Sequence, residues 1–200
     1  MSVDVTVSRV DRFKYIHTKK TEDTMSQALN ERDLIHSMMR GRNDFTGCTL
    51  EGPIDISCQS FGYNKHDDLI FNETTIIGEF FIGDLTARSI SFERVTGDGK
   101  IGIYRSTIDT IHGKGLEHGW FTVTGSFIEG IDLLSSVHKN GFMIKRTPLQ
   151  TLILDRCVSP LSLFEESDIK EVTTFEASLG RRHPVLLGEL PRVKQQRRSA

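Results

Sequence analysis

The stretch LIFNETTIIGEFFIGDLTARS, residues 69–89, is followed directly by ISFERVTGDGKIGIYRSTIDT, residues 90–110, and the two share one pattern of apolar and small residues. Three more units of 20 or 21 residues extend this pattern through residues 111–172. A short repeated unit is typical of a solenoid, because a single unit cannot bury its apolar face without its neighbours. The repeat therefore predicts the architecture of the chain.

Apolar residues fall into fixed columns when the units are aligned, beginning with Leu69, Ile90, Ile111, Ile131 and Leu152. The other apolar columns contain Phe71, Phe92, Gly113, Leu133 and Leu154; Phe80, Ile101, Phe121, Phe142 and Leu163; Ile82, Ile103, Val123 and Ile144; and Ala87, Ile108, Ile128 and Leu149. A column of glycines contains Gly78, Gly99 and Gly119. Within each unit the apolar residues alternate with polar ones, which predicts strands with one buried face.

We therefore predict an all-β fold, a single-chain β-helix solenoid of about six coils of 20–21 residues, stacked about 4.8 Å apart. The coils are expected from residue 48 to about residue 176. A leucine-rich repeat has a similar period and is the structural alternative, but the units lack its LxxLxLxxN spacing.

A helix is predicted before the first coil, at about residues 24–40. Thr24 to Gln27 fit a capping box, and Gly41 is a natural stop. The helix would carry one apolar stripe and cap the open edge of the first coil. The stripe consists of Met25, Ala28, Leu29, Ile35, Met38 and Met39. The predicted organisation is a basic N-terminal arm (1–23), the capping helix (24–42), the β-helix domain (43–178) and a basic C-terminal tail (179–200).

The segment FTGCTLEG, residues 45–52, places Phe45 and Leu50 five residues apart, with small Cys48 two residues before Leu50. This spacing resembles that of the pentapeptide-repeat proteins, and the later units are similar to degenerate relatives of that family. The resemblance covers residues 43–176 and implies a right-handed, four-sided β-helix. It implies no catalytic residues, because the family is not built around a shared active site.

The composition is that of a globular chain, with 37% apolar and 26% charged residues. No apolar run approaches the roughly 18 residues of a membrane-spanning helix, and the N-terminus lacks the apolar core of a signal peptide. Cys48, Cys58 and Cys157 form an odd, sparse set without a CxxC pair, which is typical of a reducing compartment. We therefore expect a cytoplasmic or other intracellular protein without a membrane partner.

The net charge of −2 hides an asymmetry between the body of the chain and its ends. Residues 1–20 carry +3 and residues 179–200 carry +5, which leaves −10 on residues 21–178. The ends are either solvated termini or arms that bind an acidic partner. The residues expected to bind such a partner are Arg181, Arg182, Arg192, Lys194, Arg197 and Arg198. The apolar segment HPVLLGELP, residues 183–191, either caps the last coil or docks on another protein.

The leading hypothesis is a non-enzymatic scaffold or interaction protein that works through its β-helix faces and its basic terminal arms. The expected partner is a protein, the tail is also suited to a nucleic-acid backbone, and the fold is compatible with homo-oligomers. Such a chain would be a structural subunit of a larger phage, viral or ribonucleoprotein assembly. A second hypothesis follows from the family resemblance, because some pentapeptide-repeat proteins are acidic rods that imitate duplex DNA and bind DNA topoisomerases.

A third hypothesis is a metal-dependent enzyme with a site between coils. His118 and His138 lie 20 residues apart, so adjacent coils place them at nearly the same column, and His112 lies on the coil of His118. Three imidazoles can bind zinc, although exposed turn histidines are also common. The glycine-rich segment GDGKIG, residues 97–102, falls at a turn whose glycines recur in other units, so its periodicity explains it without a phosphate. No catalytic residue and no cofactor are predicted.

Overall fold

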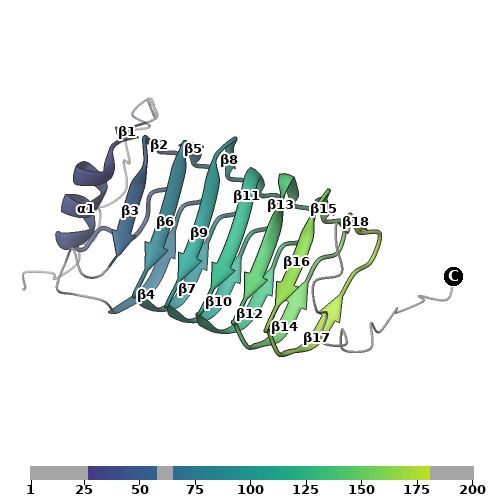
Figure 1. Ribbon diagram of the computed structural model, residues 1–200. Coiled ribbons are helices and arrows are strands. Elements are labelled where there is room, and N and C mark those ends of the chain that lie inside the picture. The colour runs from purple at the N-terminus through teal and green to yellow at the C-terminus, as the bar shows by residue number, and fades with distance from the viewer. Residues whose placement is uncertain (1–26, 58–64, 181–200) are drawn as a thin grey trace, which may run out of the picture.

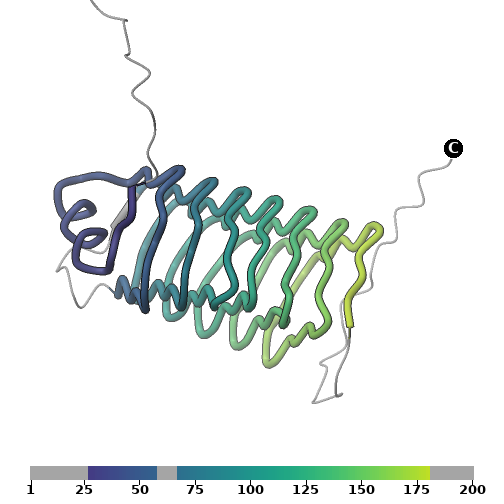
Figure 2. The backbone as a smooth tube through the Cα atoms, turned by 90° about the horizontal axis from the view of Figure 1, so that it is seen from above, coloured from purple at the N-terminus to yellow at the C-terminus, as the bar shows by residue number. Residues whose placement is uncertain are grey.

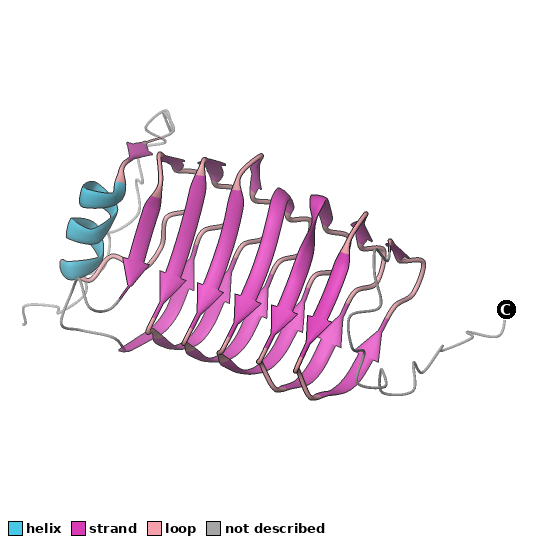
Figure 3. Cartoon of the chain, viewed as in Figure 1, coloured by secondary structure: helices cyan, strands magenta, loops and turns pink. Residues whose placement is uncertain are grey.

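The computed structural model describes residues 27–57 and 65–180. These residues form a parallel β-solenoid of about seven turns, with a helix at its N-terminal end (Figures 1 and 3). The predicted all-β solenoid with an N-terminal helix is therefore confirmed, with about seven turns where the sequence predicted about six.

The coils build two parallel sheets, named here sheet A and sheet B. Sheet A contains β1 (Ala28–Leu29), β2 (Thr49–Glu51), β3 (Ile54–Ser57), β5 (Thr75–Ile77), β6 (Glu79–Gly83), β8 (Thr96–Gly97), β9 (Lys100–Tyr104), β11 (Glu117–Thr124), β13 (Val137–Lys145), β15 (Val158–Ser159), β16 (Ser162–Glu165) and β18 (Ser178–Leu179). Sheet B contains β4 (Lys65–Ile70), β7 (Thr86–Ser91), β10 (Thr107–His112), β12 (Phe127–Asp132), β14 (Leu149–Ile153) and β17 (Ile169–Thr173).

Each coil passes through a short and a longer segment of sheet A and then through one strand of sheet B, as β5, β6 and β7 do. In β11 and β13 the short and longer segments are continuous. The coils lie side by side along the rod, as the view from above shows (Figure 2). Residues one coil apart are therefore direct neighbours, and an alternating pattern directs one set of side chains inward.

The inward columns follow the predicted alignment. Leu69, Ile90, Ile111, Ile131 and Leu152 are register partners in sheet B, and all are buried. Ile82, Ile103, Val123 and Ile144 are likewise aligned in sheet A. Like residues stack because each coil repeats the backbone path of the coil before it, so one column meets one environment along the rod.

One predicted column is wrong at its last member. Phe142 pairs with Ser162, whereas Leu163 pairs with Met143 on the outer face. The coil from Phe142 to Ser162 has 20 residues, one fewer than the aligned repeat assumed. Because side chains alternate along a strand, this single-residue difference moves Leu163 from the core to the surface.

An aromatic stack fills the interior of the first coils. The rings of Phe45 and Phe71 lie parallel with centroids 5.4 Å apart, and those of Phe71 and Phe92 with centroids 5.6 Å apart. The stack ends at Gly113, where an added Cβ would lie 2.8 Å from Cδ2 of Leu133. The glycine that interrupts the phenylalanine column is thus explained by a leucine of the next coil that takes its space.

The aligned glycines mark a corner of the coil where neighbouring backbones touch. A Cβ added to Gly99 would lie 1.7 Å from the carbonyl oxygen of Gly78, and one added to Gly119 would lie 2.4 Å from that of Gly99. No side chain fits at such distances, so the corner requires glycine for close approach.

The N-terminal helix is shorter than predicted. α1 spans Glu31–Met39 and begins at Asn30, whose side chain accepts a 3.0 Å hydrogen bond from the amide of Asp33. The prediction of helix from residue 24 is wrong for Ala28–Leu29, which form β1 and pair with β2, and the proposed cap at Thr24 lies outside the described residues. Leu34 and Met38 are buried and α1 lies across the first coil, so the capping role holds (Figure 1).

A ladder of hydroxyl groups runs along a second corner. Each hydroxyl accepts a hydrogen bond of 3.2–3.3 Å from a backbone amide one coil earlier and donates to the carbonyl two residues before it. Its members are Ser106, Ser126, Thr147 and Ser167. Buried amides that no strand pairs are satisfied in this way.

Candidate functional site

The outer face of sheet A carries aromatic side chains that lie over glycines of the neighbouring coil. Phe81 covers Gly102, because a Cβ added there would lie 2.6 Å from the Phe81 ring. Tyr104 covers Gly83 and Trp120 covers Gly141, at 2.2 and 3.0 Å by the same measure. All three aromatic residues are half-buried, so each rests on the backbone of the sheet and keeps part of its surface in solvent.

Charged groups hold the N-terminal part of this face in place. The hydroxyl of Tyr104 donates to both carboxylate oxygens of Asp55, at 2.8 and 3.0 Å. Burial and this carboxylate raise the pKa of Tyr104 to about 12, so the phenol stays protonated. The ammonium of Lys100 lies 5.4 Å from the ring centroid of Phe81, and the guanidinium of Arg105 lies 5.2 Å from that of Tyr104.

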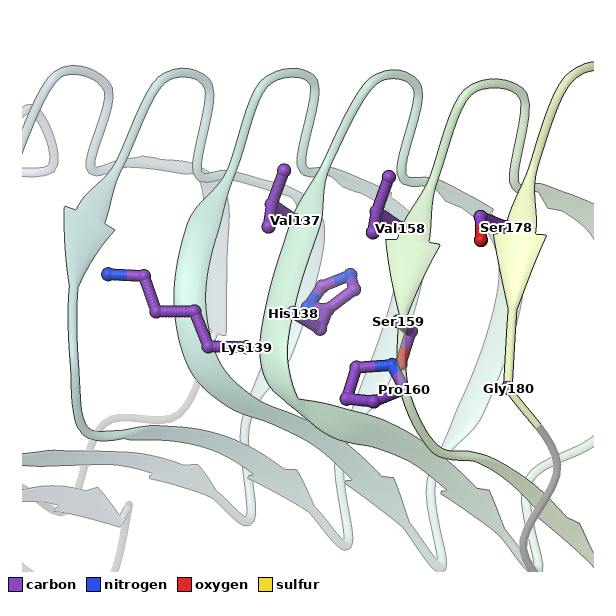
Figure 4. Close-up of a pocket in the computed structure, with 8 residues that line it drawn as sticks. All are labelled: Val137, His138, Lys139, Val158, Ser159, Pro160, Ser178 and Gly180. Atoms are coloured by element: carbon purple, nitrogen blue, oxygen red, sulfur yellow. The ribbon is translucent and has the colours of Figure 1, made fainter.

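The C-terminal part of the face carries several apolar side chains and contains a groove. Trp120, Met143 and Leu163 lie half-buried on its long strands. Val137 and Val158, 36% and 45% exposed, lie side by side on neighbouring coils (Figure 4). The groove has a volume of about 430 Å³. It is lined by Val137, His138, Lys139, Val158, Ser159, Pro160, Ser178 and Gly180.

An ion-pair cluster borders the groove. The ammonium of Lys139 lies 2.8 Å from a carboxylate oxygen of Asp98 and 3.4 Å from one of Glu117. The hydrogen bond from Lys139 lowers the pKa of Asp98, and that to Asp98 raises the pKa of Lys139. These charges are therefore compensated before any partner arrives.

Two histidines are stacked in the core beneath this part of the face. His118 and His138 are register partners on β11 and β13, as their spacing predicted, and both are fully buried. The same column contains Leu50 and Ile76 in earlier coils, and Gly97 in the coil directly before that of His118. A Cβ added to Gly97 would lie 3.0 Å from the His118 ring, so the glycine leaves room for the imidazole.

The histidines share few polar contacts with their surroundings. Ser136 Oγ lies 3.0 Å from His138 Nε2, donates to the carbonyl of Leu133 at 2.8 Å, and lies 3.4 Å from Cys157 Sγ. Because the serine has one proton and the carbonyl can only accept, we assign the Nε2–H tautomer to His138. Within the described residues, Nδ1 of His138 and both ring nitrogens of His118 form no hydrogen bond.

Burial keeps both imidazoles neutral. It lowers the pKa of His138 to about 4, and the neighbouring His118 adds to this effect. Burial also lowers the pKa of His118. It outweighs the backbone of Trp120 and the charge of Asp98, which both raise this pKa. The pKa of the Cys157 thiol is raised by its burial. The serine–histidine contact has the arrangement of a nucleophile and its base, but Ser136 and Cys157 are fully buried and lie outside the groove lining, and His138, although it lies under the groove, has no exposed surface.

The structure does not bring the three predicted metal candidates together. His112 lies on β10 in sheet B, in register with Ser91 and Asp132. In residues 27–57 and 65–180, no group of three histidine, cysteine, aspartate or glutamate side chains is arranged to hold a metal ion. The segment 97–102 has GxGxxG spacing, but it runs from the end of β8 into β9 rather than into a helix.

No match was found among protein-family models, curated proteins or solved structures. The site therefore stands on its own geometry. The predicted partner-binding residues all lie outside the described part of the chain, namely Arg181, Arg182, Arg192, Lys194, Arg197 and Arg198. In the described part, no helix is long and apolar enough to cross a membrane.

Sequence reasoning missed the aromatic face, although a signal for it exists. Phe81 and Gly102, Gly83 and Tyr104, and Trp120 and Gly141 are each 21 residues apart, which is one coil. An aromatic residue and a glycine one coil apart, both at outward positions of the repeat, indicate a ring that lies over the neighbouring backbone.

Proposed function

We propose that this chain is a non-enzymatic interaction protein that binds a partner protein on the outer face of sheet A. One observation carries the proposal: an apolar groove and a half-buried tryptophan both lie on the outer face of sheet A. Solvent-facing sheet positions are usually polar, so apolar side chains at such positions mark a contact surface.

The chemistry of the face suits a protein partner. Tryptophan, tyrosine and methionine are enriched in the cores of protein interfaces, and Trp120, Tyr104 and Met143 supply them here. Glycines beneath two of these rings keep the surface flat, and the neighbouring charges of Lys139, Asp98 and Glu117 are already paired. A partner would thus bury apolar area there without stripping water from an unpaired charge.

Mimicry of DNA receives less support than a protein-binding face. Several acidic groups at the described turns and on sheet B are paired with a basic group of the next coil, as in Glu73–Arg94, Asp84–Arg105 and Asp68–Arg88. A DNA mimic needs a continuous row of negative charge, which these compensated pairs interrupt.

The finer expectations from the sequence belong to this proposal. Kinship with the pentapeptide-repeat proteins is supported by the burial of Phe45, Cys48 and Leu50. The basic tail, with +5 on residues 179–200, would add a second, electrostatic contact to the same partner. We propose that the chain acts inside the cell as a structural subunit of a larger assembly.

The proposal is tested by affinity capture from the native source, read by mass spectrometry. The wild-type chain is compared with V158E, which charges the groove, and with a chain that ends at Gly180, which lacks the tail. F127E is the matched control, because Phe127 is exposed on sheet B. Circular dichroism first confirms that each variant is folded.

We expect V158E to lose the captured protein and F127E to keep it. Partial loss from the chain ending at Gly180 would assign the tail its supporting role. Equal capture by the wild type and V158E would contradict the proposal, because the groove would then contribute nothing to binding.

A further inference from the structure

We propose that His118 and His138 act as a pH switch in the solenoid. Protonation of the pair separates strands β11, β13 and β15 of sheet A and thereby removes the adjoining groove. The opening is a property of the chain alone. Its consequence for binding rests on the proposed function, which assigns the groove to a partner protein.

The closed core cannot accommodate a charged imidazole. A protonated histidine donates from both ring nitrogens and needs two acceptors. His138 has one hydrogen-bond partner, Ser136 Oγ at 3.0 Å from Nε2, and its Nδ1 has none among the described residues. His118, also fully buried, forms no hydrogen bond of full geometry with the described residues from either nitrogen, and among its backbone neighbours only Trp120 and Gly99 favour a charge on it. A proton on either ring therefore creates a buried charge that water can satisfy only if the coil opens.

The surrounding groups give the charged form little help. The backbone of Trp120, then Asp98 in the turn after β8 and the backbone of Gly99, favour a charge on His118, but burial outweighs them. Asp98 is already paired with Lys139 of β13, whose own charge opposes that of His118. Glu117 of β11 is paired with the same lysine. Cys157, ahead of β15, is a thiol whose ionisation is disfavoured by burial. Facing inward from sheet B are aliphatic side chains: Ile108, Ile111, Ile128 and Ile131.

The strands around the pair are suited to open before the rest of the rod. β15 and β18, which follow β13 in sheet A, have two residues each. The pairing of β11 with β13 is interrupted by a register shift immediately after His118. His138 and Lys139 of β13 line the groove, as does Ser159 of β15, so separation of these strands removes the groove (Figure 4).

The expected effect follows from the difference in proton affinity between closed and open forms. An exposed imidazole titrates near its ordinary pKa of 6.5, whereas burial lowers the pKa of His138 to about 4. The open form binds the proton first, so the equilibrium for opening shifts toward it as pH falls below 6.5. For His138 alone the opening constant rises about 100-fold by pH 4.

Hydrogen exchange of the full chain at pH 7 and pH 4, corrected for intrinsic exchange rates, measures this opening. The test variant is H118L/H138L, since the same column already holds Leu50, Ile76 and Leu179. H112L is the matched control, because His112 lies on sheet B away from the pair. We expect amide protection in β11, β13 and β15 to fall about 100-fold at pH 4 in the wild type and H112L, and to change far less in H118L/H138L.

Unchanged protection in the wild type, or an equal loss in H118L/H138L, would overturn the proposal. Should the double variant not fold, an imidazole titration of the wild type by NMR decides instead: His138 should stay neutral down to about pH 4, and ordinary titration near pH 6.5 would refute the switch. Either readout is independent of the partner. Acid opening together with partner capture that V158E does not affect would leave the switch standing and remove the proposed binding face.

Discussion

The two halves of the interior share one backbone path and differ in chemistry. In the first coils Phe45, Phe71 and Phe92 form a parallel aromatic stack. In the later coils the interior holds His118, Ser136, His138 and Cys157, all fully buried. The comparison teaches that coil stacking decides which side chains point inward, whereas the residues of each coil decide whether the interior is dry or polar. The stability of the first half should then be independent of pH, whereas that of the second half should depend on it.

The largest loss of stability is expected from a substitution in the aromatic stack of the first coils. Phe71→Ala removes the ring that contacts Phe45, Phe92 and Phe80, and should lower the free energy of unfolding by about 3–5 kcal/mol in urea titrations at pH 7. Phe127→Ala is the control, because Phe127 is 57% exposed and should lose little. Equal losses for the two variants would mean that the stack contributes nothing beyond ordinary surface contacts.

The buried histidines of the later coils should make the stability of the protein depend on pH. The folded pKa of His138, about 4, lies below its unfolded value of 6.5, so the unfolded chain binds the proton first. The stabilisation is complete above pH 6.5 and is lost as pH falls toward 4, by about 3 kcal/mol for this residue. His138→Leu should be less sensitive by that amount over the same range, measured by urea titration. Identical pH profiles for the variant and the wild type would sink this prediction.

A smaller effect is expected at the hydroxyl ladder, which crosses both halves. Ser126 Oγ accepts from the amide of Ser106 and donates to the carbonyl of Thr124. Ser126→Ala leaves that buried amide without an acceptor and should lower the free energy of unfolding by about 1–2 kcal/mol. Ser126→Thr should restore most of it, because Thr147 holds the same place one coil later. Failure of threonine to rescue would indicate that space, rather than the hydroxyl, is decisive.

The smallest effect is expected on the surface, where the two halves are alike. Arg105 and Arg146 form exposed ion pairs with Asp84 and Glu166 at equivalent turns, and Gly125 lies between them in the column. Arg146→Gln should leave the urea midpoint at physiological salt unchanged within error, because water and salt screen such pairs. A clear loss of stability would show that the turn columns contribute more than exposed ion pairs usually do.

The sequence was sufficient to predict the solenoid, because a coil that repeats its backbone path also repeats its apolar columns. It misplaced the start of the helix, since pairing with β2 draws Ala28–Leu29 into the sheet despite their helical spacing. It also misplaced Leu163, because a column is followed reliably only while every coil has the same length. Local pattern therefore predicted the elements, and tertiary pairing set their ends.

The candidate site was less accessible to sequence reasoning. The pairing of His118 with His138 was predicted from their spacing, but their burial was not, because histidines near glycines resemble turn residues. Aligning them with Ile76 and Gly97 would have shown that the column points inward. The groove depends on which outward side chains meet at one corner. Predicting it requires the relative register of three consecutive coils.

The register shift in β13 shows how this rod can change without losing its core. One residue lies between His118 and Trp120, whereas two lie between their partners His138 and Gly141, and the pairing is intact on both sides. The extra residue is absorbed at the corner, where the chain turns between two straight segments. This corner is therefore a natural place for insertions and deletions, both in the evolution of new coils and in the grafting of foreign loops onto the rod.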